Sequence, residues 1–82
     1  MLKLSNGKTV SFRNNMLRNT NGFSHTSLLF IDGVNVSMKT IKYQNRTWEA
    51  YDFQKSMTQA VELAPLTQSE KDEIIKLMEG LV

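Results

Sequence analysis

The segment Ser27-Leu-Leu-Phe-Ile-Asp-Gly-Val-Asn-Val-Ser-Met38 decides the fold, because Asp32-Gly33 separates two apolar runs. An Asp-Gly pair between alternating apolar residues is a strong signal for a β-hairpin with a two-residue turn. Such a turn pairs Ile31 with Val34. The same register predicts one buried face, made of Leu29, Ile31, Val34, Val36 and Met38.

The alternation changes phase after Met38, since Ile41 and Tyr43 are apolar at odd positions. A β-bulge near Lys39 would reconcile the two phases. After a short connection, residues 47–50 are predicted to return as a short strand.

The N-terminal residues predict another hairpin around Asn6-Gly7. A three-residue loop over residues 5–7, with Gly7 in the left-handed conformation, gives the more favourable register. It places one apolar set on one face: Leu2, Leu4, Val10 and Phe12.

Residues 13–26 form an asparagine-rich stretch without strand alternation between these hairpins. Structureless connections of this length in compact domains are usually functional or disordered, so we predict a functional loop. The alternative is a single helical turn, carrying Met16 and Leu17, that caps the sheet.

Two helices follow the strands. From Asp52, the predicted N-cap, apolar residues recur at three- and four-residue spacing until Pro65 ends the first helix. Its apolar positions are Phe53, Met57, Ala60, Val61 and Ala64. Thr67 and Glu70 form a capping box for a second helix. The stripe of that helix is Ile74, Leu77, Met78 and Leu81.

This order of elements predicts an α+β fold, with four to six short strands in antiparallel hairpins and two C-terminal helices packed on the sheet. The chain of 82 residues suits one domain over residues 1–82. A core of this size has little stability to spare, which leaves room for a homo-oligomer or a partner.

Composition narrows the functional classes. The chain has no cysteine, which excludes disulfides, thiolate metal sites and a cysteine nucleophile, and fits a reducing, cytoplasmic location. We find no signal peptide and no apolar run long enough to span a membrane, so no membrane partner is expected.

Catalytic signatures are sparse. His25 is the single histidine, and Ser24 and Asp32 could complete a hydrolytic set by composition only. No phosphate-binding loop or dinucleotide fingerprint is present. We therefore expect neither catalysis nor a cofactor, and no metal site.

Charge is segregated along the chain. Residues 1–46 hold seven basic residues against one acid, and residues 47–82 hold three against seven, giving net charges of +6 and −4. We predict that the basic half binds a partner protein. The predicted partner-binding residues are Arg13, Arg18, Phe23, Lys39, Lys42, Tyr43 and Arg46.

Two alternatives stay open for this charge pattern. The basic half could follow a nucleic acid, with Tyr43 or Phe23 stacking on bases. Otherwise, basic strands and acidic helices could neutralise each other within the fold.

The stretch Lys42-Tyr-Gln-Asn-Arg-Thr-Trp-Glu-Ala-Tyr-Asp-Phe-Gln54 resembles a Y-x-N-R-T-W-E-x-[YF]-x-[YF] signature of small uncharacterised proteins from phages and mobile elements of Gram-positive bacteria. The resemblance suggests the biological setting in which the protein acts, and it implies no catalytic activity. Small proteins of such elements often bind and redirect a host machine, including defence nucleases. It therefore favours a host-protein partner, with an anti-defence or anti-CRISPR inhibitor as one form of this function.

Overall fold

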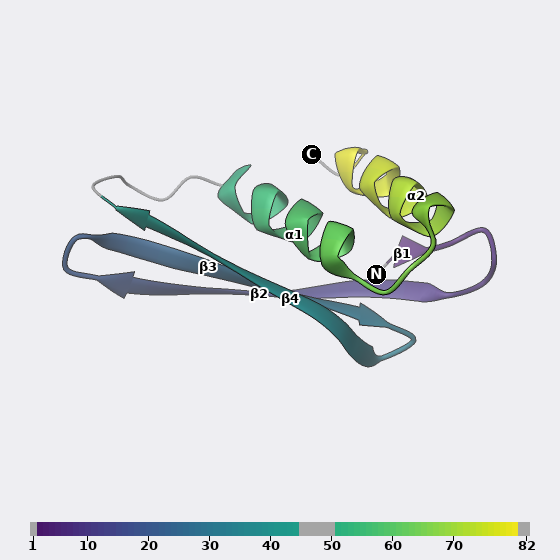
Figure 1. Ribbon diagram of the computed structural model, residues 1–82, viewed down its shortest axis with the longest axis horizontal. Helices are drawn as coiled ribbons and strands as arrows, with labels where there is room; N and C mark the ends of the chain where they lie inside the picture. Colours follow the sequence, from purple (N-terminus) through teal and green to yellow (C-terminus); the bar gives the residue numbers. More distant parts are fainter. Residues whose placement is uncertain (1, 45–50, 81–82) are drawn as a thin grey trace.

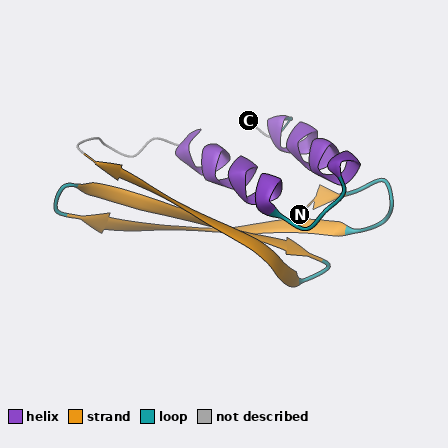
Figure 2. Cartoon of the chain, in the orientation of Figure 1, coloured by secondary structure: helices purple, strands orange, loops and turns teal. Residues whose placement is uncertain are grey.

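A computed structural model describes residues 2–44 and 51–80 of the chain. Its described residues form a four-stranded antiparallel sheet in the order β1-β2-β3-β4, followed by two helices (Figure 1). The strands are β1 (Leu2–Lys3), β2 (Thr9–Asn19), β3 (Gly22–Ile31) and β4 (Val34–Gln44), and the helices are α1 (Tyr51–Leu63) and α2 (Gln68–Glu79). Both helices lie on the same side of the sheet (Figure 2). The predicted α+β fold is confirmed; the strand expected over residues 47–50 lies outside the described residues.

The hairpin of β1 and β2 has the predicted three-residue loop. Leu2 pairs with Val10, and the Leu4 N–H donates to the Lys8 carbonyl at 2.8 Å. Gly7 has a φ of 91°, the left-handed conformation that glycine adopts without strain. The predicted apolar face is confirmed, because its members are buried in the core or packed against it: Leu2, Leu4, Val10 and Phe12.

Residues 13–26 are not a loop, and they form no helical turn. Apart from the turn at residues 20–21, they belong to β2 and β3, whose pairing runs without a break from Val10↔Ile31 to Asn19↔Gly22. The prediction was wrong because the inward positions of this hairpin include polar residues, which hide the alternation. His25 and Ser27 are both fully buried.

The turn between β3 and β4 is the predicted one. Asp32 and Gly33 have φ values of 50° and 82°, as a type I′ turn requires, and Ile31 pairs with Val34. The predicted bulge exists, but it lies at Val36 rather than near Lys39, because Phe30 pairs with Asn35 and Leu29 with Ser37.

This bulge is held by side chains. The Asn35 amide donates to the Leu29 and Ser37 carbonyls at 3.1 and 3.0 Å, and the Ser37 hydroxyl donates to the Ala60 carbonyl at 2.6 Å. The phase change therefore comes early and turns Met38 away from the helices. The predicted burial of Met38 and Val34 is wrong, since they are 58% and 64% exposed.

The helices complete the core. Asp52 lies within α1 and is not its N-cap. Thr67 and Glu70 form the predicted capping box of α2, in which the Thr67 hydroxyl accepts from the Glu70 N–H at 3.2 Å. The predicted stripe of α2 is buried at Ile74 and Met78, whereas Leu77 is exposed and Leu81 lies outside the described residues. The core cluster is Leu4, Val10, Leu29, Ile31, Ala60, Val61, Ala64, Ile74 and Met78.

Candidate functional site

The side of the sheet opposite the helices, called the open face below, is covered by none of the described elements (Figure 1). Buried and half-buried residues alternate along β3, and several of the buried ones belong to the core below the helices. The half-buried residues of β3 therefore face the open side. Leu28 lies there between its register partners Arg13 on β2 and Met38 on β4, and Phe30 lies next to it on the same face. Leu28, Phe30 and Met38 make up an apolar patch.

The open face is also basic. Lys3 on β1, Arg13 on β2 and Lys42 on β4 project from it by the same alternation. The Arg13 guanidinium lies over the Phe30 ring, 5.7 Å from its centroid, which is a cation–π geometry. Strands β1 to β4 contain no acidic residue; Asp32, in the turn between β3 and β4, accepts from the Thr9 N–H and hydroxyl through its carboxylate. The open face thus joins an apolar patch to the cations Lys3, Arg13 and Lys42, with the Asp32 carboxylate bound to Thr9, the register partner of Lys3, at one end.

The two aromatic residues predicted to meet a partner lie on the helix side instead. Phe23 is 3% exposed, and its ring stacks on Tyr43 with centroids 4.9 Å apart. His25 packs against both rings and stacks on Phe53 of α1 at 4.1 Å. Phe23 and Tyr43 therefore build the interior of the sheet–helix layer and offer no stacking platform for a base.

The remaining predicted residues are separated. Arg13 and Lys42 share the open face, whereas Arg18 is exposed near the far end of β2 in the register that faces the helix side. Lys39 is half-buried opposite the buried Ser27. Arg46 lies outside the described residues. Sequence reasoning missed Lys3 and the outward placement of the apolar patch. The patch could have been predicted from alternation, because Leu28 and Phe30 must point outward once Leu29 and Ile31 point inward.

Part of the charge pattern is neutralised within the fold. The Lys8 ammonium pairs with Glu70 on α2 at 2.9 Å, and Ser5 donates its N–H and hydroxyl to Glu73 at 2.7 and 2.9 Å. The Lys8 ammonium, the Thr67 N–H and the Asn6 amide lower the pKa of Glu70 to about 2. This contact lies at the loop between β1 and β2, on the side of α2, and the cations of the open face form no ion pair within the described part of the chain.

The possible hydrolytic set is not assembled. Ser24 and His25 are consecutive on β3 and point to opposite faces, and Asp32 is bound to Thr9 at the far end of that strand. The described residues also contain no cluster of three or more histidine, cysteine or acidic side chains that could hold a metal ion.

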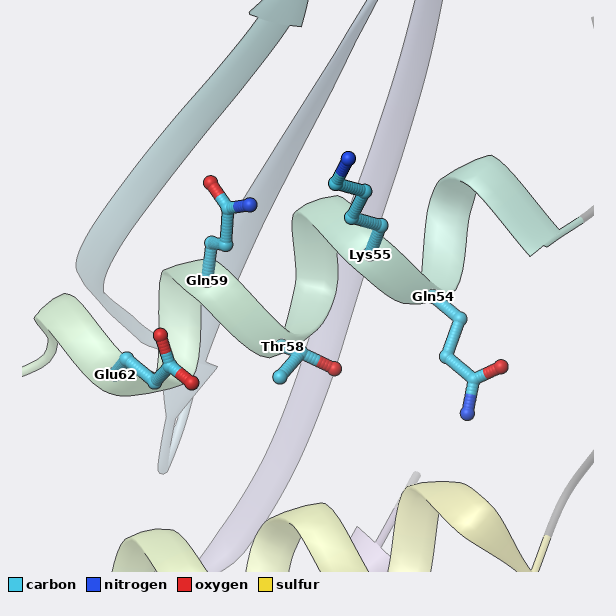
Figure 3. Close-up of a pocket in the computed structure, with 5 residues that line it drawn as sticks. All are labelled: Gln54, Lys55, Thr58, Gln59 and Glu62. Atoms are coloured by element: carbon cyan, nitrogen blue, oxygen red, sulfur yellow. The ribbon is translucent and has the colours of Figure 1, made fainter.

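A recess of about 400 Å³ runs along the exposed side of α1 (Figure 3). It is lined by Gln54, Lys55, Thr58, Gln59 and Glu62. In Figure 3 Lys55 and Gln59 project to one side of the helix and Gln54 and Thr58 to the other, and Glu62 lies across the ribbon. The lining offers a hydroxyl, amides and one charge of each sign.

Within the described ranges, neither helix combines the length and the apolar character that a bilayer crossing demands. Comparison of the chain with protein-family models, with curated proteins and with solved structures gave no match.

Proposed function

We propose that the chain is a non-enzymatic binding protein that docks through its open face on an acidic surface of a host protein. One observation carries the proposal: an apolar patch on an uncovered sheet face is accompanied by cations and by no carboxylate of the described strands. Leu28, Phe30 and Met38 supply area to bury, and Arg13 and Lys42 select an acidic partner.

A protein fits this face better than a nucleic acid does. Lys3, Arg13 and Lys42 are few for a surface that follows a phosphate backbone, and the apolar patch matches no phosphate. The Phe30 ring already carries the Arg13 guanidinium over one face, 5.7 Å from its centroid. Methionine, phenylalanine and arginine are instead enriched in protein interfaces.

The bacterial setting of the partner comes from the resemblance of residues 42–54 to small proteins of phages and mobile elements. In that setting, the partner is a protein of the infected cell. An inhibitor of a host defence nuclease is the specific form of the proposal.

The test compares an Arg13→Glu/Lys42→Glu double variant with a Lys55→Glu/Lys76→Glu control, in which two exposed lysines of the helices change charge equally. Each tagged protein is incubated with nuclease-treated lysate of a Gram-positive host. Recovered proteins are identified and re-tested, purified, for a complex on size-exclusion chromatography. We expect the wild type and the control to form the same complex, and the open-face variant to lose it.

Two results would contradict the proposal. The first is a complex of normal stability with the Arg13→Glu/Lys42→Glu variant. The second is binding that vanishes on nuclease treatment and reappears with labelled DNA or RNA, weakening steeply between about 50 and 200 mM salt, which would assign the face to a nucleic acid.

A further inference from the structure

The edge of β2 beyond β1 is an unpaired sheet edge. β1 begins at Leu2 and pairs only with Thr9 and Val10, so among the described residues no strand lies beside residues 12–19 on that side. The Thr9 carbonyl accepts from Asp32 on the β3 side, and the Lys8 carbonyl accepts from Leu4 on the β1 side.

Because antiparallel strands alternate the direction of their main-chain groups, the even residues of β2 point their N–H and carbonyl groups to this free edge. These residues are Phe12, Asn14, Met16 and Arg18. No hydrogen bond among the described residues occupies their outward main-chain groups.

The opposite edge of the sheet, on β4, is protected. It carries the bulge at Val36, which interrupts a regular ladder, and the inward, half-buried Lys39. Bulges and inward charges are the usual means by which proteins prevent edge-to-edge pairing. β2 has no bulge, since from Ser11 to Asn19 its pairing with β3 is regular; it contains no proline or lysine, and its one charge on the helix side, Arg18, is exposed.

We infer that the free edge of β2 receives an extended acidic segment of the partner as an added strand. This inference rests on the proposed function and names the part of the partner that enters. Arg13 flanks the edge on the open face and Arg18 on the helix side, and β2 contains no acid. Main-chain hydrogen bonds would hold the segment, and the arginines would select its acidic side chains.

A second copy of the chain fits this edge poorly. Pairing of β2 with β2 of another copy would bring Arg13 and Arg18 of both chains to one seam that has no carboxylate from either strand. Like charges at an interface disfavour the pairing, whereas an acidic strand relieves the same charges.

The experiment uses Met16→Pro with Met16→Ala as the matched control. Both remove the side chain, but only proline removes the outward N–H, and its ring obstructs an added strand without breaking a bond to β3. A labelled peptide of alternating glutamate and valine is titrated by fluorescence anisotropy. We expect the wild type and Met16→Ala to bind the peptide. Met16→Pro should bind it about tenfold more weakly or worse, because one hydrogen bond and part of the strand contact are lost.

Amide hydrogen exchange of the wild-type protein keeps the test valid if Met16→Pro fails to fold. With peptide, the amides of Phe12, Asn14, Met16 and Arg18 should slow, while those of Arg13, Asn15 and Leu17, already bonded to β3, should change little. The inference is overturned if the peptide slows exchange only at amides of β4. It is also overturned if folded Met16→Pro and Met16→Ala bind the peptide equally well.

Other outcomes separate the edge from the open face. A peptide-independent dimer, with the even amides of β2 protected as protein concentration rises, would assign the edge to a second copy and overturn the inference. If Met16→Pro keeps the host complex that Arg13→Glu/Lys42→Glu loses, the edge inference fails and the proposed function stands. If the open-face variant keeps that complex, the proposed function itself fails.

Discussion

Ser27 shows how single polar residues are accommodated under α1. Its side chain is fully buried, and its hydroxyl donates to Asn14 Oδ1 at 2.6 Å. It also lies 2.6 Å from the buried Ser56 hydroxyl, which in turn reaches the Phe53 carbonyl at 3.0 Å, so the three side chains and this carbonyl form one hydrogen-bonded chain. A buried hydroxyl with both partners in place avoids the desolvation penalty, so the strand tolerates a polar residue in the interior.

Ser27→Ala is expected to lower the free energy of unfolding by about 1–3 kcal/mol, because the buried Ser56 hydroxyl and the exposed Asn14 amide each lose a partner. Thr40→Ala, at the exposed Thr26–Thr40 hydroxyl contact, is the control and should change it by no more than about 0.5 kcal/mol. Urea unfolding followed by circular dichroism measures both. Equal effects of the two substitutions would refute the role of this network.

The element that joins the two ends of the chain is the first turn of α2. Glu70 closes the capping box with Thr67 and also receives the Lys8 ammonium and the Asn6 amide from the β1–β2 loop. These donors stabilise the carboxylate and lower the pKa of Glu70 from 4.5 to about 2. One side chain therefore caps a helix and fastens a distant loop to it.

This lowered pKa has a definite sign in stability. The contribution of the Glu70 carboxylate is complete above pH 4.5 and is lost as the pH falls through its folded-state pKa of about 2. Glu70→Gln keeps a capping-box side chain but carries no charge. We expect the stability difference between wild type and Glu70→Gln, measured by thermal melts, to shrink from pH 4.5 toward pH 2. A difference that stays constant across this window would show that the charge contributes nothing.

For the whole molecule, the decisive feature is that the sheet has one covered and one uncovered face. The molecule measures 44 × 23 × 19 Å, and both helices lie along one side of the long, twisted sheet (Figure 1). Residues on the covered face are therefore part of the core, and residues on the uncovered face are available to solvent or to a partner. Leu29 is fully buried below α1, and Met38 on the neighbouring strand lies on the open face.

This arrangement predicts a large contrast between two apolar residues. Leu29→Ala should reduce the free energy of unfolding by about 2–5 kcal/mol, because it leaves a cavity in the core. Met38→Ser should change it by no more than about 0.5 kcal/mol, since the side chain is already exposed. Denaturant unfolding of both variants decides the point, and a cost above 2 kcal/mol for Met38→Ser would place Met38 in an interior contact.

The candidate site was only partly accessible from sequence. The excess of cations in the first half pointed to the strands, and Arg13 and Lys42 do lie together on the open face. Phe23 and Tyr43 stack in the interior instead, because both lie on the face of the sheet that the helices cover. Exposure of an aromatic ring depends on which face the helices cover, and that is not encoded within a few residues of the ring.

The sequence by itself determined the turns at Gly7 and Asp32-Gly33, the two helices and the capping box of α2. Each of these depends on the conformational preference or hydrogen bonding of residues close together in the chain. Tertiary structure alone decided the strands over residues 13–26, the position of the bulge and the residues left on the open face. Those features depend on contacts between distant residues, such as the Ser27–Ser56 and Ser37–Ala60 hydrogen bonds, which make buried polar positions stable and so conceal the alternation of the strands.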